Sequence, residues 1–438
     1  MVAEISELVA APIVQWDFEA IEVAARREAL RVACAAIAAR LNTDHSDHIA
    51  SRLPCQCGGE ARYVDRRAKT FTTALGEMTI ERAYFHCERC DAGFCPRDRT
   101  LGVEGGSLSP HVLRMVGIVG SRVSFAEGHE LLDELAGIDV SSKQVEREAE
   151  RLGREIAQDE RNVAEPETTQ NLPATLYLGL DGTGIPMRKS EIEGRAGKQP
   201  DGSAKTREVK LCTVWSAEKR DDEGIPVRDD DSVTYTAAIE SAATHATDEG
   251  PSEFAARVAR EATRRRFEQA RRSAVLGDGA VWIWNLASEL FPDAVQIIDR
   301  YHVNEHLSGA SKAIFGTTSD AHKEWAHQRC TDLKQGKLDE VLSALAIHVS
   351  VKEAQECSEY IQKNRARMRY GEFHADGYCT STAVVESGCK RAIGLRMKNG
   401  GMFWTVPGAN AIIALRCCRL SGRFESFWER RAIARLAA

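Results

Sequence analysis

The stretch TLYLGLDGTGIPM, residues 175–187, decides the fold class because it opens as an apolar run and ends in Asp181 and glycines. A short apolar run rich in β-formers and bounded by turn residues predicts a buried strand. A helical segment, WIWNLASELF (282–291), follows later. Four more stretches predict strands: REVKLCTVWSAEK (207–219), SVTYTAAIE (232–240), AVLGDGA (274–280) and AVQIIDRYH (294–302). Strands interleaved with helices predict an α/β protein with a mixed sheet.

Composition places the chain among globular proteins, with 438 residues, 43% hydrophobic and 28% charged. At roughly 150 residues per domain, this length predicts about three domains. We find no apolar run of about 18 residues, so we expect no membrane partner. The first residues, MVAEISELVAAPIVQWDFEA, lack the basic and apolar regions of a signal peptide. We therefore expect a cytoplasmic protein with reduced cysteines.

The charge is uneven along the chain. The net charge of −7 argues against a protein that coats DNA by charge alone. Residues 361–438, however, carry 14 Lys and Arg against 5 Asp and Glu, and residues 257–272 are also basic. Local basic faces on an acidic chain are typical of a protein that grips a polyanion at chosen places.

The pattern changes at several points along the chain, and we divide it accordingly. Possible helix caps stand at Ser107 or Ser109, and at Ser141 or Ser142. We predict a helical segment over 1–50, a zinc-ribbon-like segment over 51–100, a helical, helix-turn-helix-like DNA-binding region over 101–165, the first part of the sheet core over 174–302, a helical stretch over 303–375 and C-terminal core helices over 376–438.

Two close cysteine pairs, in PCQCGG (54–59) and HCERCDAG (86–93), lie about 30 residues apart. The sequence between them predicts two short strands around Gly76-Glu77. Such a hairpin can bring four thiolates to one tetrahedral zinc ion. His86 or Cys95 can replace one ligand, and four reduced thiols without metal are the alternative. We predict one structural zinc ion held by Cys55, Cys57, Cys87 and Cys90.

Three acidic residues stand in notable contexts. Asp181 and Asp278 each end a predicted strand and precede a glycine, and Glu386 lies in a predicted helix, AVVESGCKRAIGLRMK. Carboxylates from separate elements can hold two Mg²⁺ ions about 4 Å apart, which suits phosphoryl transfer. An Asp-Gly pair after a strand is more often an ordinary turn. The pattern alone leaves both interpretations open.

A second cluster, IIDRYHVNEH, contains Asp299, His302 and His306. The histidines are four residues apart, so they share one helix face and can bind a metal ion. We favour a structural role, in which Asp299 caps a helix and the histidines pack beneath its start.

Several longer motifs occur in order along the chain: DGTGIPMR (181–188), GRAGKQPDGSAKTREVKL (194–211), GDGAVWIWNLASELFP (277–292), IIDRYHVNEHL (297–307), GYCTSTAVVESGCKRAIGLRMKNGGMFW (377–404) and GANAIIALRC (408–417). With them, the chain from about residue 53 resembles the ISKra-type transposases of bacterial insertion sequences. These are relatives of the Mutator-like and hAT-like DDE transposases.

The resemblance implies an RNase H-like core that a helical insertion, residues 303–375, interrupts. It implies that Asp181, Asp278 and Glu386 form a catalytic triad holding two Mg or Mn ions. Asp299 and His302 match a supporting Asp-x-x-His signature. The implied activity is cleavage of DNA at transposon ends, followed by transfer of the freed 3′-OH to target DNA. This chain has Thr380-Ser381-Thr382 where we expect a glycine-rich stretch, which would reduce activity if those glycines admit DNA or metal.

The implied DNA partner suggests phosphate contacts from basic residues near the core and near Glu386. The alternative is an ordinary solvated face. We expect Trp282, Trp284 and Trp404 to pack in the core rather than stack on bases. The zinc ribbon and its following helices would bind terminal repeats, and joint cutting of two ends implies a homodimer or larger assembly. The expected contacts are Lys198, Lys205, Arg207, Lys210, Arg391, Arg396 and Lys398.

Three other functions use the same residues. An RNase H-like nuclease would cut DNA without joining it. A zinc-ribbon DNA-binding regulator, descended from a transposase, would need no triad. A metal hydrolase would be built on Asp299, His302 and His306.

Overall fold

A computed structural model describes residues 17–162, 172–197, 199–222, 224–242, 252–380 and 383–437. The chain divides into two compact units. We call residues 1–151 with 425–438 the N-terminal unit, and residues 152–424 the core unit. Within the described ranges, we find no helix with the length and apolarity that a membrane crossing requires.

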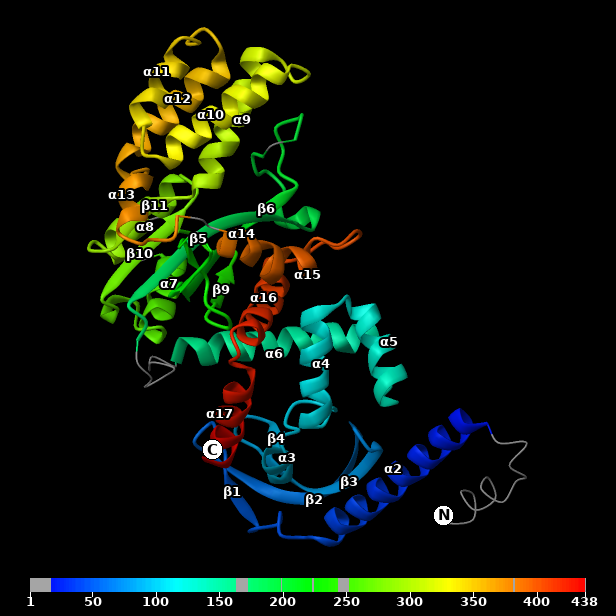
Figure 1. Ribbon diagram of the computed structural model, residues 1–438. Helices are drawn as coiled ribbons and strands as arrows, with labels where there is room; N and C mark the ends of the chain where they lie inside the picture. Colours follow the sequence, from blue (N-terminus) through cyan, green and yellow to red (C-terminus); the bar gives the residue numbers. More distant parts are fainter. Residues whose placement is uncertain are drawn as a thin grey trace. The chain divides into compact units, whose positions relative to one another are not determined.

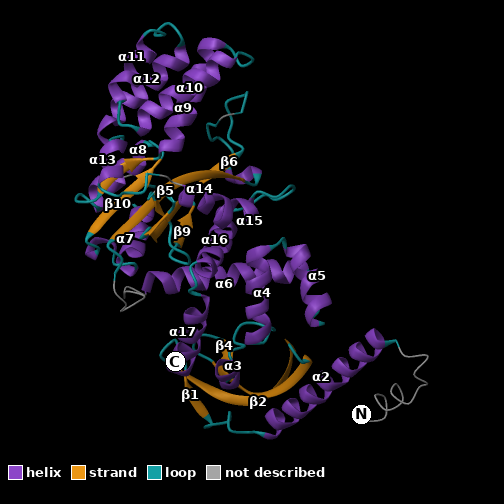
Figure 2. Cartoon of the chain, in the orientation of Figure 1, coloured by secondary structure: helices purple, strands orange, loops and turns teal. Residues whose placement is uncertain are grey.

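The N-terminal unit combines a small sheet with helices (Figures 1 and 2). Helix α6 begins in this unit and continues past residue 151 into the core unit. Helix α17 begins at Phe424, the last residue of the core unit. Residues 1–16 of the segment that we expected to be helical lie outside the described residues. The elements are α2 (Phe18–Thr43), β1 (Arg52–Pro54), β2 (Glu60–Thr73), β3 (Gly76–Cys87), β4 (Ala92–Phe94), α3 (Pro96–Leu101), α4 (Pro110–Arg122), α5 (Phe125–Ala136), α6 (Ser142–Asn162) and α17 (Phe424–Ala437).

Side-chain caps fix where the helices of this unit begin. The Ser109 hydroxyl accepts from the backbone N–H of Val112 at the start of α4. Ser124 and Glu127 form a reciprocal capping box at the start of α5. At α6, the Ser141 hydroxyl accepts from the backbone N–H of Gln144. Ser109 and Ser141 are therefore the capping residues among the alternatives that the sequence offered.

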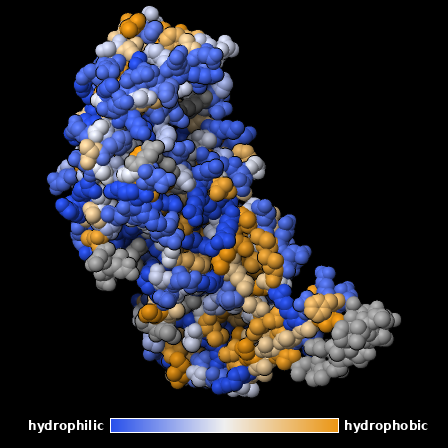
Figure 3. All heavy atoms as spheres, viewed as in Figure 1, coloured by the Kyte–Doolittle hydropathy of each residue, from blue (hydrophilic) through white to orange (hydrophobic). Residues whose placement is uncertain are grey.

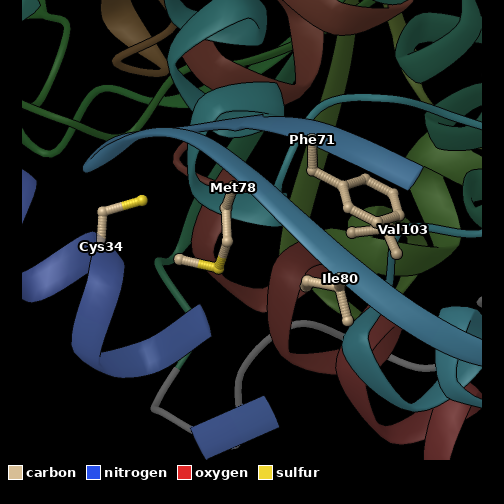
Figure 4. Close-up of a cluster of buried hydrophobic side chains, with 5 residues drawn as sticks. All are labelled: Cys34, Phe71, Met78, Ile80 and Val103. Carbon is tan, nitrogen blue, oxygen red and sulfur yellow. The ribbon is translucent and has the colours of Figure 1, made fainter. Parts of the chain in front are cut away.

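The four strands form one sheet in the order β1-β2-β3-β4, all antiparallel. The hairpin of β2 and β3 is much longer than the two short strands expected, because β2 begins at Glu60. Its first half is rich in exposed charged side chains, which hide the apolar alternation. The turn closes at the Thr73–Gly76 pair, where Gly76 has a φ of +114°. Its apolar face carries Phe71, Met78 and Ile80, which form one buried cluster with Cys34 of α2 and with Val103, just after α3 (Figure 4).

The core unit contains a second sheet and most of the helices. Residues 303–375, for which we predicted a helical stretch, are largely helical and lie between β11 and α14. The elements are β5 (Thr175–Pro186), β6 (Thr206–Ser216), β7 (Lys219–Arg220), β8 (Pro226–Val227), β9 (Thr234–Ala238), α7 (Glu253–Arg264), β10 (Arg272–Gly277), α8 (Val281–Leu290), β11 (Val295–Ile298), α9 (Arg300–Phe315), α10 (Asp320–Lys334), α11 (Leu338–Ala346), α12 (Lys352–Asn364), α13 (Tyr370–Ala375), α14 (Ala383–Gly388), a π-helical turn (Cys389–Gly394), α15 (Leu395–Met397) and α16 (Val406–Leu420).

The large sheet has five strands in the order β11-β10-β5-β6-β9. Strands β5, β10 and β11 are parallel, while β6 runs antiparallel to both β5 and β9. The prediction of an α/β protein with a mixed sheet is confirmed. Strand β5 lies in the middle, and its first six residues are all buried, as its apolar run predicts.

Helices cover both faces of this sheet. Successive side chains of a strand point to opposite faces. On β9, Thr234 and Thr236 meet Glu261 and Arg257 of α7. Tyr235 lies between them in sequence and faces α14, where it is near the Cα of Gly388. The sheet is therefore the middle of three layers, with α7 on one face and α14 on the other.

Candidate functional site

Three acidic residues lie side by side near the carboxyl ends of three neighbouring parallel strands: Asp181 within β5, Asp278 directly after β10 and Asp299 directly after β11. Strand β10 pairs with β5 at Leu276 and Gly179, so Asp278 and Asp181 each stand two residues further on. Strand β10 pairs with β11 at Gly277 and Ile298, which places Asp299 beside Asp278. Because parallel strands end at the same edge, this topology brings residues from distant parts of the chain together.

A pocket of about 200 Å³ opens at this edge. Glu386, on α14, adds a carboxylate from a different layer. Asp181 and Asp278 are half-buried, and Glu386 is exposed. The three residues expected to form a triad therefore line one cavity. The lining also includes Asp299, Tyr301, His302, Glu305, Leu180, Gly277 and Val385.

Gly179 admits α14 to this position. A Cβ at Gly179 would lie 2.1 Å from the Cγ2 of Val385 and 2.8 Å from the Trp215 ring. Neither neighbour can move far, since both are buried. Because Gly179 has no side chain, the helix that carries Glu386 can approach closely the strand that carries Asp181.

A π-helical turn follows α14 directly, and such turns are frequent at functional sites. It holds Cys389, whose side chain hydrogen-bonds with the Asp181 carboxylate. Burial raises the pKa of the Cys389 thiol, which keeps it protonated. The backbone N–H of Gly182 also donates to Asp181, at 2.6 Å. These two contacts fix the orientation of the Asp181 carboxylate.

The electrostatics of the pocket favour a bound cation. Burial raises the pKa of Asp181, and the nearby charge of Asp278 raises it further. Like-charged carboxylates that share a half-buried site repel each other unless a proton or cation lies between them. Oxygen donors of this kind suit Mg²⁺ or Mn²⁺. The residues present are therefore a chemically suitable donor set for a hard divalent ion.

Asp278 is held by contacts that sequence reasoning missed. Its carboxylate accepts from the backbone N–H of Ala280 at 2.8 Å, and its carbonyl accepts from the Tyr360 hydroxyl at 2.9 Å. Gly279 has a φ of +134°, and a Cβ there would lie 2.5 Å from the Tyr360 ring. Tyr360 lies on α12, 82 residues away in sequence. Only the fold reveals that this helix braces the Asp278 loop.

Asp299 and the two histidines occupy the start of α9. Asp299 is buried, and its carboxylate accepts from the backbone N–H of Tyr301, which caps the helix as predicted. His302 lies 3.5 Å from Glu305, and its ring centroid is 5.0 Å from that of His306. His306 stacks on Tyr360, and burial lowers its pKa. His302 faces the pocket, whereas His306 belongs to the packing beneath it.

Four of the cysteines of the N-terminal unit, Cys55, Cys57, Cys87 and Cys90, converge at one end of its sheet. Their sulfur atoms all lie within 4.8 Å of one another. The Cys55–Gly59 turn joins β1 to β2, and the Cys87–Ala92 turn joins β3 to β4. Because β2 and β3 pair at Arg62 and His86, the two turns lie side by side. Among the residues the structure describes, no other group of three or more His, Cys, Asp or Glu side chains gathers as closely. The four thiols can hold a zinc ion.

This group needs no substitute ligand. His86 instead hydrogen-bonds to Asp91, and Cys95 stands at the start of α3. The backbone N–H of Cys90 lowers the pKa of the Cys87 thiol to about 7, which favours its thiolate, whereas the neighbouring thiols raise the pKa of Cys90. Gly58, with a φ of +77°, supplies the tight turn after the first pair.

The basic residues expected to contact DNA near β6 differ in their surroundings. Lys205 is exposed. Arg207 lies 4.0 Å from Glu191. Lys210 pairs with Glu208 at 2.9 Å and lies over the Trp282 ring. Lys198 lies outside the described residues.

Beyond Glu386, the expected contacts separate into two kinds. Arg391 and Lys398 are exposed, and the Lys398 ammonium donates to the Thr183 hydroxyl at 2.5 Å, two residues from Asp181. The prediction for Arg396 is wrong, because its side chain is 0% exposed and lies over the Trp404 ring. A helical stretch with basic residues gives no sign of which one turns inward.

The three tryptophans behave largely as expected. Trp284 and Trp404 are buried, and the Trp404 indole donates to the Met397 carbonyl. Trp282 is half-buried and packs edge-on against Phe254. All three therefore contribute to packing.

Comparisons with known proteins add little to this geometry. No family model and no curated protein matches the chain. Among solved structures, the chain is similar to the Drosophila P element transposase strand transfer complex, with 10% identity over 77% of this chain and 80% of that chain. The TM-score of 0.25 is too low to indicate a shared fold. The assignment of function therefore rests on the site itself.

Proposed function

We propose that the protein is a DDE-type transposase that cuts DNA at transposon ends and joins the freed 3′ ends to target DNA. One observation carries the proposal. Asp181, within β5, and Asp278, directly after β10, each stand two residues beyond the last paired position of these parallel strands, and Glu386 reaches the same pocket from α14. Carboxylates grouped in this way can hold the two metal ions that stabilise the attacking and leaving oxygens of an in-line phosphoryl transfer.

The topology of the core unit supports an RNase H-like core. That fold has three antiparallel strands in succession, then two parallel strands on the other side of the first. Here β5, β6 and β9 form the antiparallel set, and β10 and β11 lie beyond β5. The helices α9–α13 between β11 and α14 correspond to the implied insertion.

Asp181, Asp278 and Glu386 would hold two Mg²⁺ or Mn²⁺ ions in this proposal. When bound, such ions polarise the attacking and leaving oxygens of the scissile phosphodiester. Gly182 and Cys389 orient Asp181, and Tyr360 and Ala280 orient Asp278. Asp299 and His302 support the pocket wall from α9. Lys398 and Arg391 would contact phosphates flanking the cut.

The N-terminal unit would recognise the DNA. The four-cysteine group would hold one structural zinc ion, and the helices α4–α6 would supply the helix-turn-helix-like element. Base contacts from such a helix give specificity, while phosphate contacts fix its register. A dimer or larger assembly would bring two ends together.

The test is a strand-cleavage and strand-transfer assay on DNA carrying the ends of the surrounding genetic element. The variants are Asp278→Ala and, as a matched control, Asp293→Asn, an exposed aspartate outside the pocket. We expect Mg²⁺- or Mn²⁺-dependent nicking and joined products from wild type and control. The Asp278→Ala variant should lose both by about 10³-fold or more.

The other outcomes identify the alternatives. Nicking without joined products would indicate an RNase H-like nuclease. Specific end binding with no cleavage by wild type would indicate a DNA-binding regulator. Loss of the zinc ion on substitution of His302, but not of Cys87, would indicate a metal hydrolase built around the histidines.

A further inference from the structure

A large groove in the N-terminal unit has no role in the proposed function. It encloses about 620 Å³ between residues 23–38 of α2, the β2–β3 turn and the end of α5. The Arg26 guanidinium donates to the Leu135 and Ala136 carbonyls at 3.1 and 2.9 Å, which ties α2 to the end of α5. Contacts within a single chain therefore form the groove.

The walls of the groove are largely apolar. They include Val23, Leu30, Cys34, Leu75 and Met78. Val23 is 58% exposed although it is a large aliphatic residue. Figure 3 shows hydrophobic residues gathered over this region of α2, β3 and α5. Apolar side chains that gather in a groove, rather than standing singly on the surface, are a feature of binding sites.

The rim of the groove is basic. Arg26, Arg27 and Arg31 stand along α2 and line the opening. Arg27 and Arg31 are exposed, and Arg31 forms its ion pair with Glu28 on the same helix. A partner that presents apolar side chains flanked by carboxylates would match both the walls and the rim.

Helix α5 of this chain has that surface. Leu131 and Leu135 lie one helical turn apart and are 38% and 72% exposed. Glu127, Glu130 and Glu134 are exposed and flank the two leucines on one side of the helix. The element thus pairs an apolar ridge with an acidic edge, the complement of the groove.

We propose that the groove beside α2 receives helix α5 of a second copy of this chain, and that this contact makes the protein a homodimer. The end of α5 also borders the groove, so ridge and groove are neighbours on one surface. Two copies related by a two-fold axis can therefore exchange α5 helices reciprocally, which closes the assembly at two. The inference rests on the proposed function, which needs two copies to hold two DNA ends. The contact itself needs neither DNA nor metal, so a failure to dimerise is distinguishable from a failure to cleave.

The test is the molar mass of the full-length protein in solution, measured by light scattering without DNA. Arg27→Glu and Glu134→Arg should each weaken the dimer about tenfold, since each places like charges across the contact. The double variant should restore the affinity to within about threefold of wild type. Arg40→Glu, exposed near the end of α2 and outside the groove, is the matched control.

Leu135→Ser gives an independent readout, because it removes the most exposed apolar side chain of the ridge while keeping the charges. It should also weaken the dimer about tenfold, with an unchanged far-ultraviolet circular dichroism spectrum. A wild-type protein that stays monomeric at about 100 µM would overturn the proposal. So would a dimer that is unaffected by both charge reversals, or one that is lost only when residues 1–16 are deleted.

Discussion

The two candidate metal sites of this chain are built in opposite ways. In the N-terminal unit, four thiols from two tight turns converge until their sulfur atoms lie within 4.8 Å of one another. In the core unit, Asp181, Asp278 and Glu386 line one pocket but do not gather as closely. The first is a closed site, and the second keeps space for something else to enter.

That difference agrees with the difference between structural and catalytic metal sites. A structural zinc ion takes all its ligands from the protein, whereas a catalytic ion leaves positions for water and substrate. The thiols come from one hairpin sheet, so only local folding is needed to assemble them. The carboxylates come from β5, β10 and α14, so the whole core must fold before the pocket exists.

The largest effect should come from removing zinc. Substituting Cys87→Ser, or adding a strong chelator, should unfold the cysteine end of the small sheet, because apparent binding energies of structural zinc reach about 10–16 kcal/mol. Protease cleavage should increase between residues 52 and 94. The bound zinc, measured by elemental analysis, should fall from one ion per chain to none.

The core unit should remain folded in the same experiment. Five of the seven tryptophans, Trp215, Trp282, Trp284, Trp325 and Trp404, belong to this unit, so their emission reports on it. That emission should not change when zinc is removed. The control is Cys95→Ser, which should keep its zinc. A collapse of both signals together would mean that the two units do not fold independently.

Acid should act mainly on the core unit through Glu261. Burial alone would raise the pKa of Glu261, but ion pairing and hydrogen bonds from Arg423, together with Thr234, lower it to about 2. A lowered carboxyl pKa stabilises the folded state above the unfolded value of 4.5, and this contribution is lost as pH falls toward 2. The loss should reach about 3 kcal/mol.

The measurement is the free energy of unfolding by urea between pH 5 and pH 2.5, followed by tryptophan emission. Glu261→Gln should flatten this pH dependence, and exposed Glu268→Gln should leave it as in wild type. Glu160 is a second buried carboxyl group in the core unit, but its titration is separate from that of Glu261. Burial raises its pKa above the ordinary value, so its titration lies at higher pH. An unchanged slope in Glu261→Gln would contradict the assignment.

A smaller change should separate the pocket from the sheet that carries it. Gly179→Val would push Val385 and α14 away from β5, with a cost of about 1–3 kcal/mol for overpacking. Because Glu386 moves with the helix, cleavage should fall well beyond what the lost stability explains. Gly309→Ala, on α9 where no atom lies within 4 Å of the added Cβ, is the control. Equal activity of Gly179→Val and wild type would show that the approach of α14 is unimportant.

The sequence predicted the parts of each site that depend on neighbours along the chain. The cysteine pairs were found by spacing, and Asp181 and Asp278 by following apolar runs. The prediction that Asp181 ends its strand is wrong, because β5 continues to Pro186 by pairing with β6. It did not predict the length of β2, because exposed charges mask its alternation. Nor did it predict that Arg396 turns inward over Trp404, since only tertiary packing decides which face of a helical stretch is covered.

The smallest effect concerns Tyr360, which only the fold connects to the pocket. Tyr360→Phe removes one hydrogen bond to the Asp278 carbonyl and should cost about 1 kcal/mol of stability. Tyr370→Phe is a matched control, because it also removes a buried tyrosine bond to a backbone carbonyl, that of Ile298. Both variants should lose similar stability. Only Tyr360→Phe should raise the Mg²⁺ concentration for half-maximal cleavage, by about tenfold, since supporting contacts of metal ligands have effects of this order. Equal Mg²⁺ requirements in the two variants would mean that α12 stabilises the core without positioning Asp278, and the open site would then owe its geometry to the strand ends alone.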